Sequence, residues 1–282
     1  MRTTSKLLGF VLVSITAAAC GSADDFAAFE AQGAVASTAA ALTASQGALG
    51  WANGWLHDVV ATPAELSENV YTATSPSLVA MAPGVKAANR TVCGTLMTRL
   101  LQTTGLTSSN FYNSFPKSTA TANCNVGASG GTSSPDASQY VHKIADCAST
   151  GTVLFTKRTT VGAIVAGDIL AVAYPERTDI SGHVMMVRSA PQTDSTLPAG
   201  PDGSTAYAVE IIDSTSTPHG TSTTYPDNRP GAGGAANNQG FGTGTFVVYA
   251  DTMGAIVATR WSPTDSTRYS TTEHPVAVGG VQ

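Results

Sequence analysis

The chain has 282 residues, of which only 12% are charged, and its formal net charge at pH 7 is −5. This length allows one ordinary domain with a full hydrophobic core. Lysine and arginine are not clustered anywhere, and binding of phosphates requires concentrated positive charge, so we expect no nucleic-acid partner.

The chain begins with the three parts of an export signal. Arg2 and Lys6 supply positive charge, residues 7–15 form a short apolar run, and small residues follow up to Cys20. An apolar run this short does not span a bilayer, which takes about 20 helical residues, so we expect residues 1–19 to be a cleaved signal peptide. The segment Ala-Ala-Ala-Cys resembles the bacterial lipobox, which implies lipidation of Cys20. Ordinary signal cleavage just before Cys20 would instead leave it as a free thiol.

A lipid on Cys20 implies attachment to the membrane of a bacterial cell envelope. Gly21 stands where an aspartate would favour retention at the inner membrane, so the outer membrane is expected. Residues 20–47 are rich in alanine and small polar residues and predict a tether. Residues 48–282 then form a single domain.

The first part of this domain has the pattern of helices. Bulky residues from Trp51 onward indicate a helix that packs on the domain. Apolar residues recur at helical spacing over residues 92–101, and Gly105 can end that helix, which therefore begins near Val92. Residues 139–147 predict a short amphipathic helix.

From residue 152 the pattern changes to that of strands. Residues 251–254 form a hairpin turn, and residues 214–243 form a long loop rich in glycine, asparagine and proline. Helices followed by a run of antiparallel strands predict an α+β fold. The expected strands are residues 152–156, 168–174, 183–189, 206–213, 245–250 and 255–261.

Three cysteines remain in the domain. In an oxidising compartment nearby thiols pair, and an odd number leaves at least one of them free. We expect a disulfide between Cys124 and Cys147, which leaves Cys93 free. Cys93 falls in the first turn of its helix, where partial positive charge stabilises a thiolate. The alternative is that Cys93 is a small buried hydrophobic residue.

Two polar residues stand at the ends of predicted strands. His183 opens one strand and Asp213 closes another. If these strands are antiparallel neighbours, the two residues face each other with Cβ atoms roughly 5 Å apart. Asp213 would then orient the His183 imidazole so that its other nitrogen faces Cys93. The sequence therefore predicts a catalytic triad of Cys93, His183 and Asp213.

These segments resemble the papain-like cysteine hydrolases of cell walls, namely the NlpC-type peptidases and the CHAP amidases. The resemblance implies a papain-like α+β fold in which the nucleophile helix packs on a five- to six-stranded antiparallel sheet. It also implies cleavage of an amide bond, with peptidoglycan peptide as the substrate, by a divergent member of the family. The matching segments are residues 93–96, 167–170, 182–187 and 209–214.

The expected reaction begins when His183 takes the proton of Cys93. The thiolate attacks an amide carbonyl, and water then hydrolyses the thioester. The backbone N–H of Cys93 and one upstream donor, either Asn89 or Tyr71, would stabilise the oxyanion. His219 lies in a turn shortly after the predicted strand that Asp213 closes, and it is a candidate to line the substrate cleft.

No cofactor or metal ion is expected. The Cys, His and Asp residues lack the spacing of metal ligands, and the glycines of residues 231–244 lack the context of a phosphate-binding loop. Two alternatives stay open beside the hydrolase. One is a non-catalytic envelope lipoprotein that uses the same fold for binding or structure, and the other is an acyltransferase or transglutaminase-like enzyme.

Overall fold

The computed structural model describes residues 44–60, 68–73, 78–80, 88–116, 124, 134–220, 222–229 and 239–282. The expected signal peptide, the lipidated Cys20 and the first part of the expected tether lie outside these residues. None of the helices within these residues combines the length and the apolar character needed to cross a membrane.

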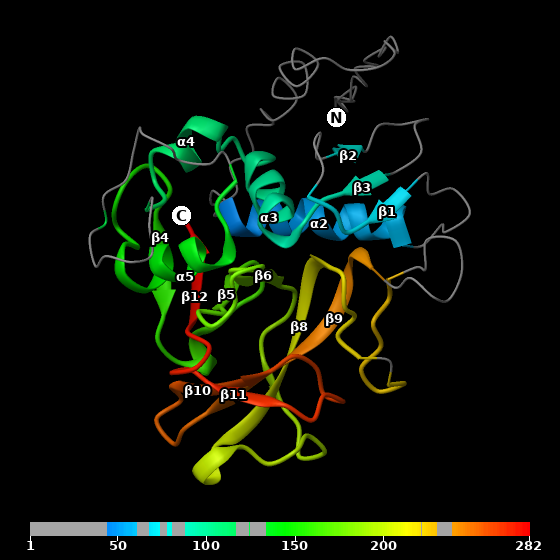
Figure 1. The fold of residues 1–282 in the computed structure, drawn as a ribbon, viewed down its shortest axis with the longest axis vertical. Coiled ribbons are helices and arrows are strands. Elements are labelled where there is room, and N and C mark those ends of the chain that lie inside the picture. Colours follow the sequence, from blue (N-terminus) through cyan, green and yellow to red (C-terminus); the bar gives the residue numbers. More distant parts are fainter. Residues whose placement is uncertain are drawn as a thin grey trace, which may run out of the picture. The chain divides into compact units, whose positions relative to one another are not determined.

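One large antiparallel sheet makes up most of the regular structure in the described chain (Figure 1). Its strands follow the order β11-β10-β9-β8-β6-β5-β12-β4, and the short β7 pairs with β8. The strands are β4 (Phe155–Arg158), β5 (Ile169–Ala173), β6 (Gly182–Val187), β7 (Gln192–Thr193), β8 (Thr205–Thr215), β9 (Gly240–Ala250), β10 (Ile256–Arg260), β11 (Arg268–Ser270) and β12 (Val276–Val281).

A small second sheet consists of β1 (Glu68–Val70), β3 (Ala88–Arg90) and β2 (Leu78–Ala80), in that order. A buried asparagine, Asn69, attaches it to the start of β9. The Asn69 amide donates to the Phe241 carbonyl at 2.9 Å, and the Phe241 N–H donates back to Asn69 Oδ1 at 2.8 Å. This reciprocal pair fixes the small sheet next to the end of β9 from which the site is built.

Four α-helices accompany the sheets in the described residues. They are α2 (Ala44–Val60), α3 (Cys93–Gln102), α4 (Ser108–Tyr112) and α5 (Ala137–Asp146), and two 3-10 turns cover Val161–Ala163 and Pro201–Gly203. Helix α2 begins at Ala44, so residues 44–47, which were expected in the tether, are helical. Ser45 ties this helix to the sheet, because its hydroxyl oxygen accepts a hydrogen bond from the Val281 N–H at 2.5 Å.

Each face of the large sheet carries its own apolar cluster, as the two-residue period of a strand requires. Helices α3 and α5 pack on one face, where Leu96 and Ile144 join Met186 of β6. The opposite face carries a second cluster, which includes Met185 and Ile211. Figure 1 shows α2 and α3 next to the end of the sheet at which β6 begins and β8 ends.

The expected fold class, a papain-like α+β domain with a five- to six-stranded sheet, is wrong. The sheet has nine strands in the described residues and dominates the structure, while the helices are few and mostly short. Three of the nine strands, β7, β11 and β12, were not expected. They are short or rich in glycine, as in the sequence Val-Ala-Val-Gly-Gly-Val of β12, and so they carry a weak strand signal.

Asp168 is a structural residue. It is 1% exposed, and both of its oxygens accept hydrogen bonds from Arg158, at 2.9 and 3.0 Å. The Val165 N–H donates to the same carboxylate at 2.9 Å. These bonds join the start of β5 to β4 across the intervening β12.

We predict that Asp168→Ala lowers the free energy of unfolding by about 2 kcal/mol, measured by urea denaturation. The change leaves the Arg158 guanidinium and a backbone N–H without their acceptor, and the partial exposure of Arg158 limits the loss. Asp179→Ala is the matched control, because Asp179 accepts the same bidentate bonds from Arg177 at an exposed site. It should leave stability unchanged, and an equal loss in the two variants would contradict the structural role of Asp168.

Candidate functional site

Cys93 is the first residue of α3 and is 7% exposed. The preceding Val92 has extended backbone geometry and offers no side-chain acceptor to the helix. The first N–H groups of a helix have no partner inside the helix, and the Cys93 thiol lies next to them. It forms no disulfide in the part of the chain that the structure describes.

The start of α3 lies where β6 and β8 separate. The two strands pair at Met186–Ile212 and at the next position along, but not toward the end of the sheet near α3. There the Ser214 hydroxyl donates instead to the Thr91 carbonyl at 2.7 Å. Strand β8 thus holds the segment that leads into Cys93.

His183 lies on β6 at the same end of the sheet. The preceding Gly182 has φ 138°, and a Cβ there would come within 2.0 Å of the Val172 carbonyl oxygen, so only glycine fits before His183. His183 Nε2 lies 2.5 Å from Asp213 Oδ2, and both side chains are buried.

The contact between His183 and Asp213 is diagonal, whereas the sequence predicted that the two residues face each other directly. Met186 pairs with Ile212, and continuing this register places Asp213 opposite Met185. The diagonal separation of two residues on neighbouring strands, about 7–8 Å, is within reach of an imidazole and a carboxylate.

The thiol of Cys93 is hydrogen-bonded to His183. Burial alone raises the pKa of this thiol. The charge and the hydrogen bond of His183, with further bonds from the Val184 and Gly94 N–H groups, outweigh burial and lower the Cys93 pKa below its ordinary value. Since Nε2 of His183 is bonded to Asp213, Nδ1 is the nitrogen left for the thiol.

Asp213 is completely buried and has two further partners. Its Oδ2 lies 2.9 Å from His219 Nε2, and its Oδ1 forms an ion pair with Arg229. Arg229 also forms an ion pair with Asp227, and its Nε donates to the Gly240 carbonyl at 3.0 Å. Burial lowers the pKa of Arg229 to about 9, which leaves it positively charged at neutral pH.

Two glycines of β9 make room for these partners. A Cβ on Gly242 would lie 2.4 Å from Cγ of Arg229, and a Cβ on Gly244 would lie 2.6 Å from Cβ of His219. The glycine-rich start of β9 therefore leaves a strip of sheet without side chains, on which His219 and Arg229 lie next to Asp213.

His219 is enclosed on several sides. Its ring stacks on Trp261 at 3.9 Å between centroids, and its Nδ1 lies 2.7 Å from the Trp261 carbonyl oxygen. Its backbone N–H donates to Asp227 at 2.7 Å. Burial, followed by the charge of His183, lowers the pKa of His219 to about 3, so a freely protonated imidazolium is disfavoured there.

The two candidate oxyanion donors differ in position. The Tyr71 hydroxyl is hydrogen-bonded to the Cys93 thiol, and burial together with the charge of Cys93 raises the pKa of Tyr71 to about 12. Tyr71 therefore stays a donor at neutral pH. Asn89 is completely buried and is bonded to Asn69 and Thr91, so its side chain supports the small sheet and does not reach the thiol.

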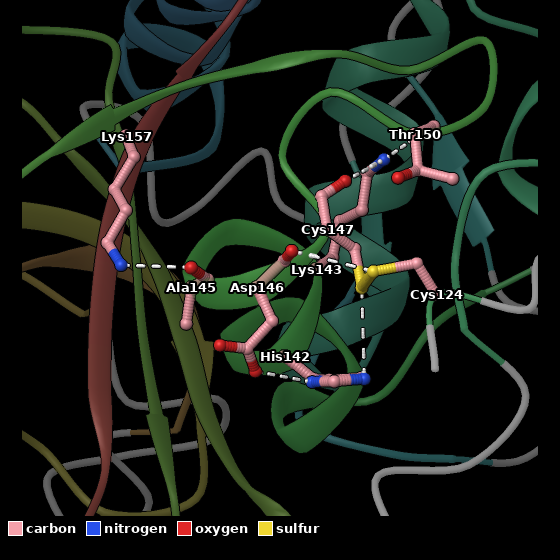
Figure 2. Close-up of a disulfide and its surroundings, with 8 residues drawn as sticks. All are labelled: Cys124, His142, Lys143, Ala145, Asp146, Cys147, Thr150 and Lys157. Carbon is pink, nitrogen blue, oxygen red and sulfur yellow. Dashed lines mark hydrogen bonds and ion pairs between the residues drawn. A yellow bond between two sulfur atoms is a disulfide. The ribbon is translucent and has the colours of Figure 1, made fainter. Parts of the chain in front are cut away.

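Cys124 and Cys147 form a disulfide at the end of α5 (Figure 2). Lys143 is buried beside it and donates to the carbonyl oxygens of Cys147, at 2.9 Å, and Thr150. Burial lowers the pKa of Lys143 to about 8. His142 Nε2 faces Cys147 Sγ at 3.8 Å. These contacts stabilise the C-terminal end of α5, and we assign them a structural role.

Within the described residues, His183, Asp213 and His219 also form a group that could hold a metal ion, since their ligand atoms lie within 4.8 Å of one another. Both imidazole nitrogens are already at hydrogen-bond distance from a single carboxylate oxygen, and Arg229 neutralises the other oxygen. A cation between them would have to displace both bonds next to an existing positive charge. We therefore interpret the group as a hydrogen-bonded network.

Sequence reasoning missed Asp227, Arg229 and Trp261. Asp227 and Arg229 lie in the long loop between β8 and β9, whose composition only indicates a loop, and Trp261 ends the expected strand 255–261, a position that predicts no contact with the site. The one available signal was the alternation of glycines at 240, 242 and 244, because glycine at every second position of a strand leaves one face bare.

Comparison with known proteins finds a similarity to a viral protein. An uncharacterized protein of Acanthamoeba polyphaga mimivirus, R653, is 32% identical over 136 residues, which are 44% of this chain and 56% of that protein. The chain thus spans about half the length of the curated relative it matches. No family model matches the chain, and no solved structure matches it.

These findings correct the resemblance to papain-like cell-wall hydrolases on a bacterial lipoprotein. No such family matches, and the similar protein comes from a virus. The resemblance rested on four short segments. One of them, at residues 167–170, contains Asp168, whose carboxylate has the structural role described above.

We predict that Gly244→Ala slows the reaction of Cys93 with iodoacetamide by roughly tenfold or more. The added methyl group displaces His219 and, through Asp213, the imidazole of His183. Gly162→Ala is the matched control, because nothing lies within 4 Å of a Cβ at that position. If Gly244→Ala folds and Cys93 reacts at the rate of the unchanged protein, the loop does not position the site.

Proposed function

We propose that this chain is a cysteine-dependent acyl-transfer enzyme that cleaves an amide or related acyl bond, with Cys93 as nucleophile. The observation that carries the proposal is the chain of contacts from the Cys93 thiol to His183 and from His183 Nε2 to the buried Asp213 carboxylate at 2.5 Å. A nucleophile bonded to a base that is itself held by a third group is the arrangement that nucleophilic catalysis requires.

The first step is transfer of the Cys93 proton to His183. The imidazolium then lies between the thiolate and the Asp213 side chain. Donation from the Val184 and Gly94 N–H groups supports the thiolate. Asp213 fixes the ring so that Nδ1 serves the thiol.

The second step is attack of the thiolate on the acyl carbon of the substrate. Negative charge develops on the carbonyl oxygen, and donors that point to this position stabilise the transition state. The N–H groups of the first turn of α3 lie beside the sulfur, and the Tyr71 hydroxyl is bonded to it. We assign oxyanion stabilisation to these groups and exclude Asn89, whose bonds are made within the small sheet.

In the third step His183 returns its proton to the leaving amine or alcohol, and a thioester on Cys93 remains. Water or another nucleophile, activated by the neutral imidazole, then releases the acyl group and restores the thiol. Hydrolase and acyltransferase differ only in this acceptor. The proposed substrate is an acyl compound in general. Peptidoglycan as a substrate and a lipid anchor were expected only from resemblances of short sequence segments, so neither is part of this proposal.

One observation favours a non-catalytic binding or structural protein as the second candidate. Cys93 and His183 are only 7% and 5% exposed, so little of the reacting pair meets solvent in this conformation. A buried cysteine can also be a small apolar residue of the core. A measured titration of the thiol distinguishes the two functions, since an inert core cysteine has no reason to ionise at neutral pH.

We predict that p-nitrophenyl acetate acetylates Cys93, detected by peptide mass spectrometry together with release of p-nitrophenolate. Cys93→Ser should form no thioester, and His183→Gln should be acetylated at least about 100-fold more slowly. His142→Gln is the matched control, because this histidine belongs to the disulfide cluster. Equal rates in His183→Gln and the unchanged protein would contradict the proposal.

We also predict the pH dependence of alkylation by iodoacetamide. Only the thiolate reacts, and the Cys93 pKa is lowered, so the rate should stay high below the ordinary thiol pKa of about 8.5. It should fall only when the pH passes through the lowered pKa. His183→Gln removes the main stabilising partner and should move this fall to higher pH. A rate that rises only near the ordinary pKa in the unchanged protein would favour the non-catalytic candidate.

We predict that Tyr71→Phe lowers the rate of acetylation by roughly 100-fold while changing alkylation little. Acetylation passes through an oxyanion and alkylation does not, so the two reactions separate a donor to the oxyanion from a donor to the thiolate. Equal losses in both reactions would show that Tyr71 acts on the thiolate alone.

A further inference from the structure

We propose that Asp213 and His219 share one proton between Oδ2 and Nε2, and that His219 is thereby a positioning residue that sets the charge facing His183. This inference deepens the proposed function, because it concerns the carboxylate that orients the base. It rests on the hydrogen-bond geometry of the buried network around Asp213.

The count of donors and acceptors requires this proton. The Trp261 carbonyl oxygen can only accept, so His219 Nδ1, 2.7 Å away, must carry a hydrogen. A neutral imidazole with its hydrogen on Nδ1 has a bare lone pair on Nε2. That lone pair would face Asp213 Oδ2 at 2.9 Å, and two acceptors do not approach so closely. One further proton must therefore lie between Nε2 and Oδ2.

The balance of buried charge points the same way. Two carboxylates, Asp213 and Asp227, share a single guanidinium, Arg229, and the side chains of all three are at most 1% exposed. If all three side chains are ionised, together they carry one uncompensated negative charge, which is costly in a buried site. One shared proton cancels it.

The surroundings prevent His219 from turning away from this contact. The charged and titratable groups that face it are Asp213 from β8, His183 from β6, and Asp227 and Arg229 from the loop after β8. Trp261 covers its ring from the end of β10. Burial disfavours an imidazolium that holds the proton alone, so the proton belongs to the pair.

The shared proton lowers the negative charge that His183 experiences. With it, Asp213 still accepts the bond from His183 Nε2 but does not act as a full anion toward the imidazole. Without it, a full carboxylate would favour imidazolium more strongly and delay release of the proton to the leaving group. His219 thus keeps the base able both to take and to return a proton.

The test compares Cys93→Ser with Cys93→Ser/His219→Gln. Serine at position 93 lets His183 titrate without the thiol, so the result does not depend on whether acyl transfer occurs. Glutamine retains an N–H donor toward Asp213 but has no titratable proton. The measurement is the titration midpoint of His183, followed by NMR in protein labelled with nitrogen-15 histidine, with free metal removed by a chelator.

We expect the midpoint to rise by about one unit or more in the His219→Gln protein, because Asp213 becomes a full anion. His219→Asn is the matched control. It retains the donor to Trp261 and loses the one to Asp213, and it should also raise the midpoint. A rise in His219→Asn with none in His219→Gln would overturn the proposal, since His219 would then supply only an ordinary hydrogen bond.

If the Cys93→Ser/His219→Gln protein does not fold, the NMR spectrum of Cys93→Ser alone tests the proposal. The proposal expects a hydrogen on Nδ1 of His219 and a proton shared by Nε2 at neutral pH. An Nε2 resonance typical of a bare nitrogen without a hydrogen bond would overturn it. Failure of the acetylation experiment with a raised His183 midpoint would reject the proposed reaction and leave the shared proton intact.

Discussion

The structure around the candidate site depends on one buried carboxylate. Asp213 lies at the end of the sheet with no exposure to solvent, and an unpaired charge there would cost several kcal/mol. Its two oxygens are therefore met by three groups, His183 from β6 and His219 and Arg229 from the loop after β8. Removing any of these groups leaves a buried carboxylate oxygen without one of its partners.

The scaffold supplies what this carboxylate needs. Strand β9 has no side chains at Gly242 and Gly244, so Arg229 and His219 can lie directly against it. Strands β6 and β8 separate near this end of the sheet, and the start of α3 lies there. This position places Cys93 next to His183. Thus a strip of glycines in β9 and the short pairing between β6 and β8 are the two features of the sheet that build the site.

Part of this arrangement could be predicted from local patterns. Helical spacing after Val92 placed Cys93 in a first turn, and strand boundaries placed His183 and Asp213 at the same end of a sheet. The predicted fold class was wrong because a resemblance between short segments does not determine the number of strands in a sheet. In addition, the glycine-rich sequence of β12 gave only a weak strand signal. Arg229 and Asp227 could not be found, since which loop residues return to a buried carboxylate depends on tertiary contacts. The pairing of Asp213 with His219 was missed for the same reason.

The central claim is that His183 and the buried network behind it lower the pKa of the Cys93 thiol. The most direct test is the ultraviolet absorbance of the thiolate, taken as the difference between the unchanged protein and Cys93→Ser across a range of pH. The account predicts a thiolate signal that is already present at neutral pH and is lost only on acidification. A difference that is absent at neutral pH and develops only near the ordinary thiol pKa of about 8.5 would contradict it.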